Sequence, residues 1–307
     1  MTHAGDVGII IVTHNSAVEI GPCLDAALPA HSPIVVIDNA SEDGTREEVR
    51  RRGVRLVANP RNLGFAAAVN QGVRAMNTPL LLLLNPDVVM QTGLEALGNA
   101  CNQPQTAAAG GMLVDDSGAP QVGFMVRRFP TPATLCFEVL LVNRVWPRNP
   151  VNWQYRCLDL EYSAPLEVEQ PPGAFLMIRR DAWEKLGGFD ETFCPIWFED
   201  VDFLKRAKQS GYHIRYVPEA VAKHTGGHSI RKISVEFRQF YWYRSLLKYA
   251  AKHFSPGAGK VVCLAVIIGS LLRTVLGIPC QRSLKPIAVY GRVVKLAGRQ
   301  LLFGTAG

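Results

Sequence analysis

The sequence lacks the cysteine patterns of a disulfide framework or a zinc site. Its seven cysteines are an odd number, are scattered from Cys23 to Cys280, and include no CxxC pair. This usage predicts free thiols in a reducing compartment. The first six residues are too short and too polar for a secretory signal peptide, and strand-like sequence begins at Val7. We therefore expect a cytoplasmic protein.

Acidic residues are almost absent from the C-terminal quarter of the chain. Residues 231–307 hold 13 lysines and arginines and a single acid, Glu236, whereas residues 1–230 hold 20 basic and 25 acidic residues. A basic tail on a mildly acidic body predicts a polyanionic partner. The tail contains no RNP-like, zinc-finger or helix-turn-helix signature, and apolar stretches interleave with its charges. We therefore expect an anionic membrane surface as partner and no nucleic acid.

Regular alternation of strand-like and helix-like segments fills the first 115 residues. With 307 residues, 48% of them hydrophobic, the chain can bury a large core, and it is neither disordered nor polytopic. The alternation predicts a βαβ series with a mainly parallel sheet. Residues 116–170 lack a regular pattern, and so long an excursion is usually functional. The expected strands are 7–12, 34–37, 54–57, 80–84, 107–114, 174–178 and 214–217, and the expected helices are 16–28, 43–52, 65–76, 92–102, 181–186 and 199–210.

The basic tail contains helix-like apolar segments. Residues 233–254 read as a long aromatic-rich helix, and residues 261–278 are apolar apart from Arg273 and two hydroxyl residues. An 18-residue helix spans roughly 27 Å, just short of a hydrocarbon core of about 30 Å, and a central arginine would cost ~2–3 kcal/mol. We therefore expect a helix in the membrane interface, followed by an amphipathic surface helix over residues 286–301. A soluble helical cap or a homodimer interface is the alternative.

Polar clusters follow the first three strands. Thr13 and Asn15 follow the first, Asp38 the second, and Arg61 and Asn62 the third. Each cluster lies at the C-terminal end of its strand, so all three converge on one crevice of an open α/β sheet. Taken singly, each could be no more than a turn or a helix cap. A series on successive strands indicates a binding site.

Two short acidic motifs carry the most information about chemistry. Asn85-Pro86-Asp87 follows the run of leucines at 80–84, and Glu199-Asp200 stands at the start of an expected helix. An acid after a buried strand lies at the ligand-binding edge of the sheet. One acid there suits a metal–diphosphate and a separate acid suits a proton acceptor, as sugar transfer from a nucleotide requires. The alternative for the second motif is stabilisation of a helix N-terminus.

The ordered set of motifs resembles family 2 glycosyltransferases of the GT-A fold. The motifs are T-H-N-S, D-N-A-S-x-D-G-T, N-x-x-N-x-G-F, L-N-P-D-V, G-G-F-D-E-x-F and F-E-D-V-D-F, and they cover residues 7–230. Within the family the set looks most like bacterial rhamnosyltransferases of cell-wall linker and O-antigen synthesis. The resemblance implies a Rossmann-like, mainly parallel mixed sheet flanked by helices. It divides the chain into a catalytic domain, 1–230, and a helical extension, 231–307.

The resemblance also implies roles for the residues of the donor site. Asp38 matches the acid that binds the nucleotide base, and Asp87 matches the last acid of the DxD metal motif. Asn85 stands where that motif has its first acid, but Asp87 can still bind one Mg²⁺ or Mn²⁺ beside diphosphate oxygens. His224 matches a histidine that completes the metal shell, although a lone histidine is more often structural. The other residues implied in nucleotide-sugar binding are Thr13, Asn15, Arg61, Asn62 and Asn85.

The Glu199-Asp200 pair matches the family's catalytic pair, in which the aspartate is usually the base. Phe198 stands where the family often has tryptophan, and Trp197 is beside it, so aromatic residues suited to a sugar-binding wall flank the pair. Asp190, in the preceding G-G-F-D-E motif, is an expected acceptor contact.

The function that follows is inverting sugar transfer. The resemblance implies dTDP-L-rhamnose, or else a UDP-sugar, as donor. The implied acceptor is a glycan or a polyprenyl-diphosphate-linked sugar at the inner membrane face. One alternative is a sugar-nucleotide pyrophosphorylase, but that class usually has a glycine-rich basic loop where this chain has Thr13-His14-Asn15-Ser16. The other alternative is a non-catalytic binding or scaffold protein on the same fold.

Overall fold

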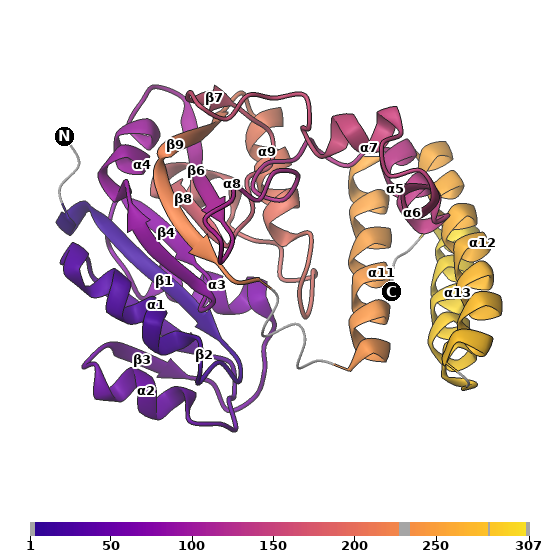
Figure 1. Cartoon of the computed structure of the whole chain (residues 1–307), viewed down its shortest axis with the longest axis horizontal. Coiled ribbons are helices and arrows are strands. Elements are labelled where there is room, and N and C mark those ends of the chain that lie inside the picture. The colour runs from indigo at the N-terminus through magenta and orange to yellow at the C-terminus, as the bar shows by residue number, and fades with distance from the viewer. Residues whose placement is uncertain (1–3, 227–233, 282, 305–307) are drawn as a thin grey trace. The chain divides into compact units, whose positions relative to one another are not determined.

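The computed structural model describes residues 4–226, 234–281 and 283–304 (Figure 1). It confirms an α/β fold in which helices flank a mixed sheet and further helices follow at the C-terminal end. Internal contacts divide the described residues into two units. Unit 1 contains residues 4–129, 159–195 and 199–226. Unit 2 contains residues 130–158, 196–198 and the described residues from 234 to 304.

A nine-stranded sheet forms the centre of unit 1. Its order is β3-β2-β1-β4-β8-β6-β9-β5, and β7 pairs with β9. The pairings of β1 with β2 and β4, of β2 with β3 and of β6 with β9 are parallel. The strands are β1 (Val7–Thr13), β2 (Ile34–Asp38), β3 (Arg55–Ala58), β4 (Leu80–Leu84), β5 (Val88–Thr92), β6 (Thr106–Val114), β7 (Leu166–Glu167), β8 (Phe175–Arg179) and β9 (His213–His224).

The leucine run that predicted a strand at 80–84 forms β4 with those same bounds. All five leucines are buried, because β4 lies between β1 and β8 and is covered on both faces. Strand β1 is buried in the same way, and its last residue, Thr13, pairs with Asp38 of β2. The C-terminal ends of β1, β2 and β4 therefore lie at one edge of the sheet.

The helices of unit 1 form where the sequence predicts them. Helix α9 shows why: it begins at Glu199 with acids in its first turn and carries Arg206 and Lys208 in its last turn, which complements the helix dipole. The helices are η1 (Ala4–Asp6), α1 (Ile20–Ala27), η2 (Leu28–Ala30), α2 (Thr45–Arg51), α3 (Phe65–Arg74), α4 (Leu94–Cys101), α8 (Arg180–Leu186) and α9 (Glu199–Gln209).

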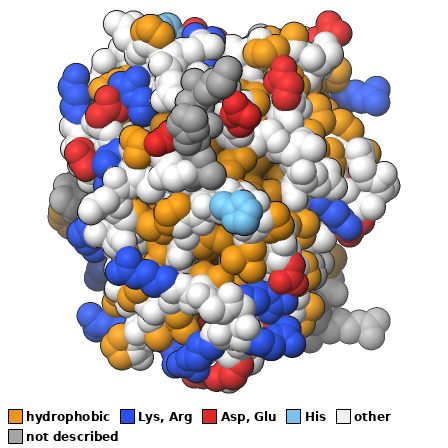
Figure 2. Space-filling model, turned by 90° about the vertical axis from the view of Figure 1, so that its left-hand side faces the viewer, with side chains coloured by type: hydrophobic (Ala, Val, Ile, Leu, Met, Phe, Trp, Pro, Cys, Tyr) orange, Lys and Arg blue, Asp and Glu red, His pale blue; other side chains and the backbone are white. Residues whose placement is uncertain are grey.

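The face of the molecule in Figure 2 carries acidic and basic side chains interspersed with each other. The sequence of the tail, in contrast, is nearly free of acidic residues.

Strand β9 is three times as long as the expected strand at 214–217. Proline has no N–H to donate to a neighbouring strand, so Pro218 led to the prediction that the strand ends at residue 217. The structure places it in a bulge, where the partners of β6 jump from Val217 to Val221. His224 is therefore the last residue of a strand, paired with Val88 of β5, and does not simply follow a turn.

Unit 2 is helical, and three of its helices fall in the segment 116–170 that was expected to be irregular. Two of these begin with a recognisable cap: the side chains of Thr131 and Asn149 each accept a bond from a backbone N–H in the first turn, and a proline follows each. The helices are α5 (Pro132–Val139), α6 (Val142–Val145), α7 (Pro150–Tyr155), α11 (Val235–His253), α12 (Pro256–Gln281) and α13 (Lys285–Phe303).

Helix α12 carries Arg273 on its packed side. Arg273 donates hydrogen bonds to the carbonyls of Glu138 and Val139 at the end of α5. Ser270 is fully buried on the same helix. By length and composition, residues 256–280 are apolar enough to cross a membrane, and one third of the most apolar window is buried within the protein.

Candidate active site

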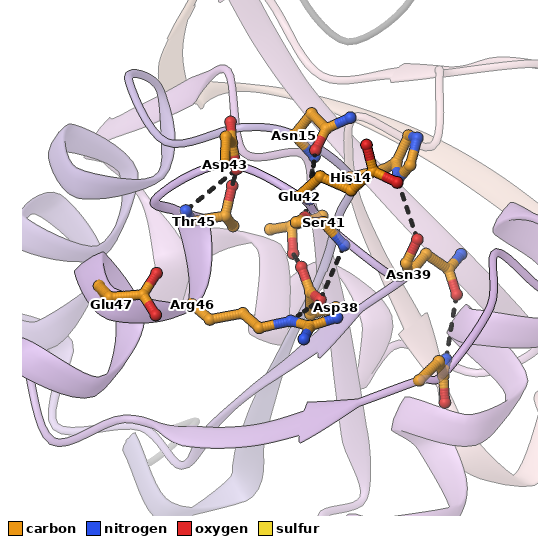
Figure 3. A network of polar contacts seen from close by, with 12 residues as sticks. His14, Asn15, Asp38, Asn39, Ser41, Glu42, Asp43, Thr45, Arg46 and Glu47 are labelled. Carbon is orange, nitrogen blue, oxygen red and sulfur yellow. Dashed lines mark hydrogen bonds and ion pairs between the residues drawn. The ribbon is translucent and has the colours of Figure 1, made fainter.

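A network of polar contacts joins the loops that follow β1 and β2 (Figure 3). Thr13 donates to Asp38 Oδ1 at 3.2 Å, and the Ser41 N–H donates to Asp38 Oδ2 at 3.1 Å. Arg46, from the first turn of α2, places Nε 2.6 Å from the same Oδ2. Asp38 has no exposed surface. The carboxylate therefore organises this loop pair, and Arg46 is the charge that balances it.

Asn15 links the same two loops. It has a left-handed backbone with φ of 53°. Its N–H donates to Ser41 Oγ at 2.8 Å, and its side-chain Oδ1 accepts from the Glu42 N–H at 2.8 Å. The residues that follow Asp38 thus form a turn that is hydrogen-bonded to the loop after β1.

The loop after β3 is held by amide side chains. Asn62 Oδ1 accepts the Gly64 N–H at 2.9 Å, and Arg61 is exposed. Gly64 has φ of +89°, and a Cβ there would lie 3.2 Å from the carbonyl of Pro195. The next N–H, of Phe65, donates to that carbonyl at 2.7 Å. Close backbone approach explains the glycine of the N-x-x-N-x-G-F motif.

Asp87 and His224 face each other at the sheet edge, with His224 Nε2 3.8 Å from Asp87 Oδ2. Both are more than nine-tenths buried. Burial lowers the pKa of His224, and the negative charge of Asp87 opposes this shift. Asn85, two residues earlier, donates its N–H to the carbonyl of Ala174.

A carboxylate oxygen and an imidazole nitrogen are suitable ligands for a divalent cation. No group of three or more His, Cys, Asp or Glu that could hold a metal occurs in residues 4–226, 234–281 and 283–304. The protein would therefore supply two ligands, and a diphosphate and water the rest, as Mg²⁺ sites with few protein carboxylates do. On that basis, the residues present fit a cation that arrives with a nucleotide.

Glu199 and Asp200 differ in their surroundings. Asp200 accepts the Gly173 N–H at Oδ2 and the Val201 N–H at Oδ1, each at 2.8 Å. Burial raises the pKa of Asp200, while these bonds oppose the shift. Glu199 is 4% exposed and its Oε2 has no hydrogen-bond partner. Burial and the neighbouring Asp200 raise the pKa of Glu199 well above its usual value.

Asp202, the third acid of this motif, has a structural contact. It is fully buried and accepts Arg206 Nε at 2.9 Å. Arg206 also donates to the carbonyls of Leu186, the last residue of α8, and of Gly188, two residues beyond it. This pair thereby fixes the G-G-F-D-E loop against α9.

The expected acceptor residues lie in different units. Asp190, in unit 1, accepts the side chain and the N–H of Thr192 in a tight turn. Trp197 belongs to unit 2 and has φ of 79°. Its neighbour Phe198 packs on Tyr249 of α11, with ring centroids 5.3 Å apart.

Several site residues carry no signal that sequence reasoning could use. Gly173 contributes only its backbone N–H to Asp200, and Gln121 contacts His224 from 103 positions away. Arg46 is one of many arginines in the chain. His228, a second histidine near the end of the resembling region, lies outside the described residues.

Comparison with known proteins finds two family models that match the chain. The model of glycosyl transferase family 2 matches residues 8–187, and that of the N-terminal domain of galactosyltransferase matches residues 158–228. The N-acetylglucosaminyl-diphospho-decaprenol L-rhamnosyltransferase of Mycobacterium tuberculosis is 31% identical over 247 residues, which cover 72% of this chain and 76% of the relative.

Two solved structures resemble the fold. A mannosyltransferase from Pyrobaculum calidifontis, in complex with GDP-Man and Mn²⁺, has a TM-score of 0.55 at 16% identity and covers 99% of this chain and 89% of its own. GalNAc-T7 with UDP, GalNAc and Mn²⁺ has a TM-score of 0.57 at 17% identity and covers 80% and 50%. These likenesses confirm the GT-A fold. The family match over residues 8–187, together with the 31% identical relative, shows that the chain belongs to glycosyl transferase family 2.

Proposed function

We propose that this glycosyltransferase inverts the anomeric centre while it moves L-rhamnose from dTDP-L-rhamnose to a polyprenyl-diphosphate-linked sugar. The sugar and the class of acceptor follow the name of the mycobacterial relative, an N-acetylglucosaminyl-diphospho-decaprenol L-rhamnosyltransferase. The dTDP carrier follows from the resemblance to bacterial rhamnosyltransferases. A UDP-sugar donor and a free glycan acceptor are the alternatives within the same reaction class. Family membership favours transfer over the pyrophosphorylase alternative.

One backbone relationship carries the proposal. The Asn85 N–H donates to the Ala174 carbonyl at 2.9 Å, and the next residue back, Gly173, donates its N–H to Asp200. Asp87 and Asp200 are thereby tied to one stretch of backbone at the sheet edge. A site for the diphosphate and a carboxylate for the acceptor hydroxyl then adjoin each other, as single displacement requires.

We assign Asp200 as the base. The acceptor hydroxyl oxygen forms a bond to the anomeric carbon, the bond from that carbon to the diphosphate oxygen breaks, and the hydroxyl proton passes to Asp200. The two N–H groups on Asp200 favour its ionised form and fix its orientation. Burial and the neighbouring Asp200 raise the pKa of Glu199, which favours the protonated form of Glu199 beside an ionised Asp200.

Asp87 and His224 are our candidates for holding Mg²⁺ or Mn²⁺. Such a cation would act as a Lewis acid that offsets the charge developing on the nucleoside diphosphate. Mn²⁺ accompanies the nucleotides of both structural neighbours. The distance of 3.8 Å between Asp87 Oδ2 and His224 Nε2 supports the assignment.

The remaining donor residues are assigned from their place at the same edge. Asn15 would meet the base or ribose. Asp38 and Thr13 are buried and hydrogen-bonded to each other, so they would hold the loop that receives the base. The exposed Arg61 would meet the base or diphosphate, with Asn62 shaping its loop and Asn85 lining the diphosphate site. Asp190 and Trp197 remain candidates for acceptor contact.

Unit 2 would hold the enzyme on the cytoplasmic face of an anionic membrane. Between residues 261 and 276, the exposed side chains of α12 are all aliphatic, and the tail has a large excess of basic residues. Apolar burial and attraction to anionic lipid both favour a surface-bound helix. The exposed aliphatic residues are Val261, Leu264, Ile268, Leu271, Leu272, Val275 and Leu276.

A donor panel tests the function. Purified protein is offered dTDP-rhamnose and UDP-, GDP- and CMP-sugars with Mg²⁺ or Mn²⁺, with and without a polyprenyl-diphosphate sugar, and nucleotide release is recorded. We expect release from dTDP-rhamnose that the acceptor accelerates. Tight binding of dTDP with no turnover of any donor would favour the non-catalytic scaffold.

A further inference from the structure

The segment after β6 lies beside the candidate metal site. Its backbone is anchored independently of its side chains: the Gln121 N–H donates to the Leu113 carbonyl at 2.8 Å, and the Gln121 carbonyl accepts the N–H groups of Phe124 and Met125, both at 3.0 Å. This is the start of the long excursion whose function the sequence left open. The anchoring allows the side chain of Gln121 to be replaced without releasing the loop.

Gln121 contacts His224 at two points. Its Nε2 donates to the backbone carbonyl of His224 at 2.7 Å, and its Oε1 lies 3.0 Å from the ring Nδ1. On the face of the ring, Phe124 stacks on the imidazole with centroids 5.0 Å apart and planes 12° from parallel. The hydrogen bond to Nδ1 and the stacking of Phe124 together fix the orientation of the His224 ring.

The two contacts together fix the position of the imidazole proton. Only the NH₂ of an amide side chain can donate to a carbonyl, so the group that faces Nδ1 is the amide oxygen. An oxygen there requires Nδ1 to carry the proton. In the neutral ring the lone pair then lies on Nε2, the nitrogen that faces Asp87 Oδ2 at 3.8 Å.

Two electron-pair donors that face each other with no proton between them suit a cation. We propose that Gln121 is a positioning residue: it selects the Nδ1–H tautomer of His224, so that Nε2 is presented to the metal of the sugar-nucleotide site. Outer partners of this kind orient a ligand ring and raise its basicity. The inference rests on the proposed role of His224, but the tautomer itself exists without metal.

The same segment continues toward Asp200, the proposed catalytic base. The N–H and carbonyl of Arg127 pair with the carbonyl and N–H of Gln170, at 3.0 and 3.1 Å. Gln170 lies three residues before Gly173, the donor to Asp200. The segment from Gln121 to Arg127 therefore braces both halves of the site, and Gln121 is its contact with the metal half.

The first test reads the tautomer in metal-free protein. Ring ¹⁵N chemical shifts distinguish Nδ1–H from Nε2–H imidazole, and comparison with His224→Ala assigns the signal. At a pH above the imidazole pKa we expect Nδ1–H in the parent and in Gln121→Glu, whose carboxylate still accepts, and a mixed tautomer in Gln121→Met. An Nε2–H tautomer in the parent overturns the inference.

The second test measures Mn²⁺ affinity in the presence of dTDP, by the EPR signal of free Mn²⁺. Gln121→Met should weaken Mn²⁺ binding about 10–100-fold. It should add nothing in a His224→Ala background, because it acts through that ring. Gln103→Met, at an exposed glutamine, is the matched control and should leave affinity unchanged.

The outcomes separate this inference from the proposed function. If His224→Ala weakens Mn²⁺ binding and Gln121→Met does not, Gln121 has no positioning role and the metal site stands. If neither variant changes Mn²⁺ affinity, His224 is not a ligand and the inference fails with it. Sugar transfer is judged independently by donor turnover.

Discussion

Arg46 Nε lies 2.6 Å from Oδ2 of Asp38, a carboxylate with no exposed surface (Figure 3). Asp38 holds the loop that we assign to the nucleotide base, so its orientation matters to donor binding. A buried carboxylate is stable only when its oxygens receive donors. Arg46 is the charged one among its three protein donors, the others being Thr13 and the Ser41 N–H.

Replacement of Arg46 by leucine should destabilise the fold and weaken dTDP binding. Because Arg46 is partly exposed, and Thr13 and Ser41 still donate to Asp38, we expect a loss of about 1–3 kcal/mol in the free energy of unfolding. Urea denaturation and dTDP titration measure the two effects. Arg50→Leu is the matched control on the same helix, since its pair with Glu47 is exposed. Equal losses in both variants would show that Asp38 does not depend on Arg46.

Asp200→Asn should lower sugar transfer by about 10²–10⁴-fold and leave dTDP affinity within a fewfold, because only proton removal is lost. In the parent, the rate should fall as pH falls through the raised pKa of Asp200, so the acid limb should lie above that of an ordinary aspartate. Initial rates across pH measure this. If Glu199→Gln loses turnover while Asp200→Asn keeps it, the roles of the pair are reversed.

Glu199→Gln should change how stability depends on pH. The raised pKa of Glu199 means that the folded chain keeps a proton that the unfolded chain releases near the usual value of 4.5. The stability contributed by this group is complete below that value and is lost as pH rises through the folded-state pKa. Glutamine cannot ionise, so the Tm of Glu199→Gln relative to the parent should increase from about pH 5 to about pH 8. Parallel Tm curves for the two proteins, like those expected for the exposed Glu95→Gln, would contradict this.

The sequence predicted those parts of the fold that local patterns determine. Five leucines specified β4 with its bounds, and the acids at 199–202 marked the start of α9. The same patterns identified Asp87 and Asp200 as candidate site residues, because the end of a strand and the start of a helix are local features of the sequence. Helices α5 and α7 could also have been predicted from the sequence, since Thr131-Pro132 and Asn149-Pro150 are recognisable helix caps.

Other features depend on contacts distant in sequence. Pro218 interrupts the strand pattern, and only the bulge opposite Gly111 shows how β9 continues to His224. In the sequence, Arg273 is an isolated charge within an apolar helix. In the structure, it donates hydrogen bonds to carbonyls at the end of α5, which are distant in sequence. Gln121 is a lone glutamine in an irregular stretch, and nothing local connects it with His224.

Removal of the metal should weaken donor binding. Asp87→Ala removes one of the two protein ligands that we propose, so Mn²⁺-dependent dTDP affinity should fall at least as far as it does on loss of an outer partner, which costs about 10–100-fold. A chelator should reproduce this loss in the parent and have little further effect on Asp87→Ala. Calorimetry with and without Mn²⁺ measures it. Unchanged transfer in the presence of a chelator would remove the cation from the mechanism.

Charged substitutions on the exposed face of α12 should release the protein from membranes. Ile268 and Val275 are 51% and 68% exposed, and the polar contacts of Arg273 lie on the other side of the helix. The double variant Ile268→Asp, Val275→Asp should therefore leave the packing of α12 on α5 intact, which a deletion of the helix would not. Burial of an aliphatic side chain is worth about 1.5–3 kcal/mol, so binding to anionic liposomes should weaken at least about tenfold.

Flotation with anionic and with neutral liposomes distinguishes the sources of this binding. High salt should weaken attachment of the parent only in part, because apolar burial is not screened as surface charge is. Val18→Asp is the matched control, since Val18 is 79% exposed but lies in unit 1, and it should float like the parent. If the double variant also floats like the parent while its mass in solution falls from dimer to monomer, the α12 face is an interface between two copies of the chain and not a membrane surface.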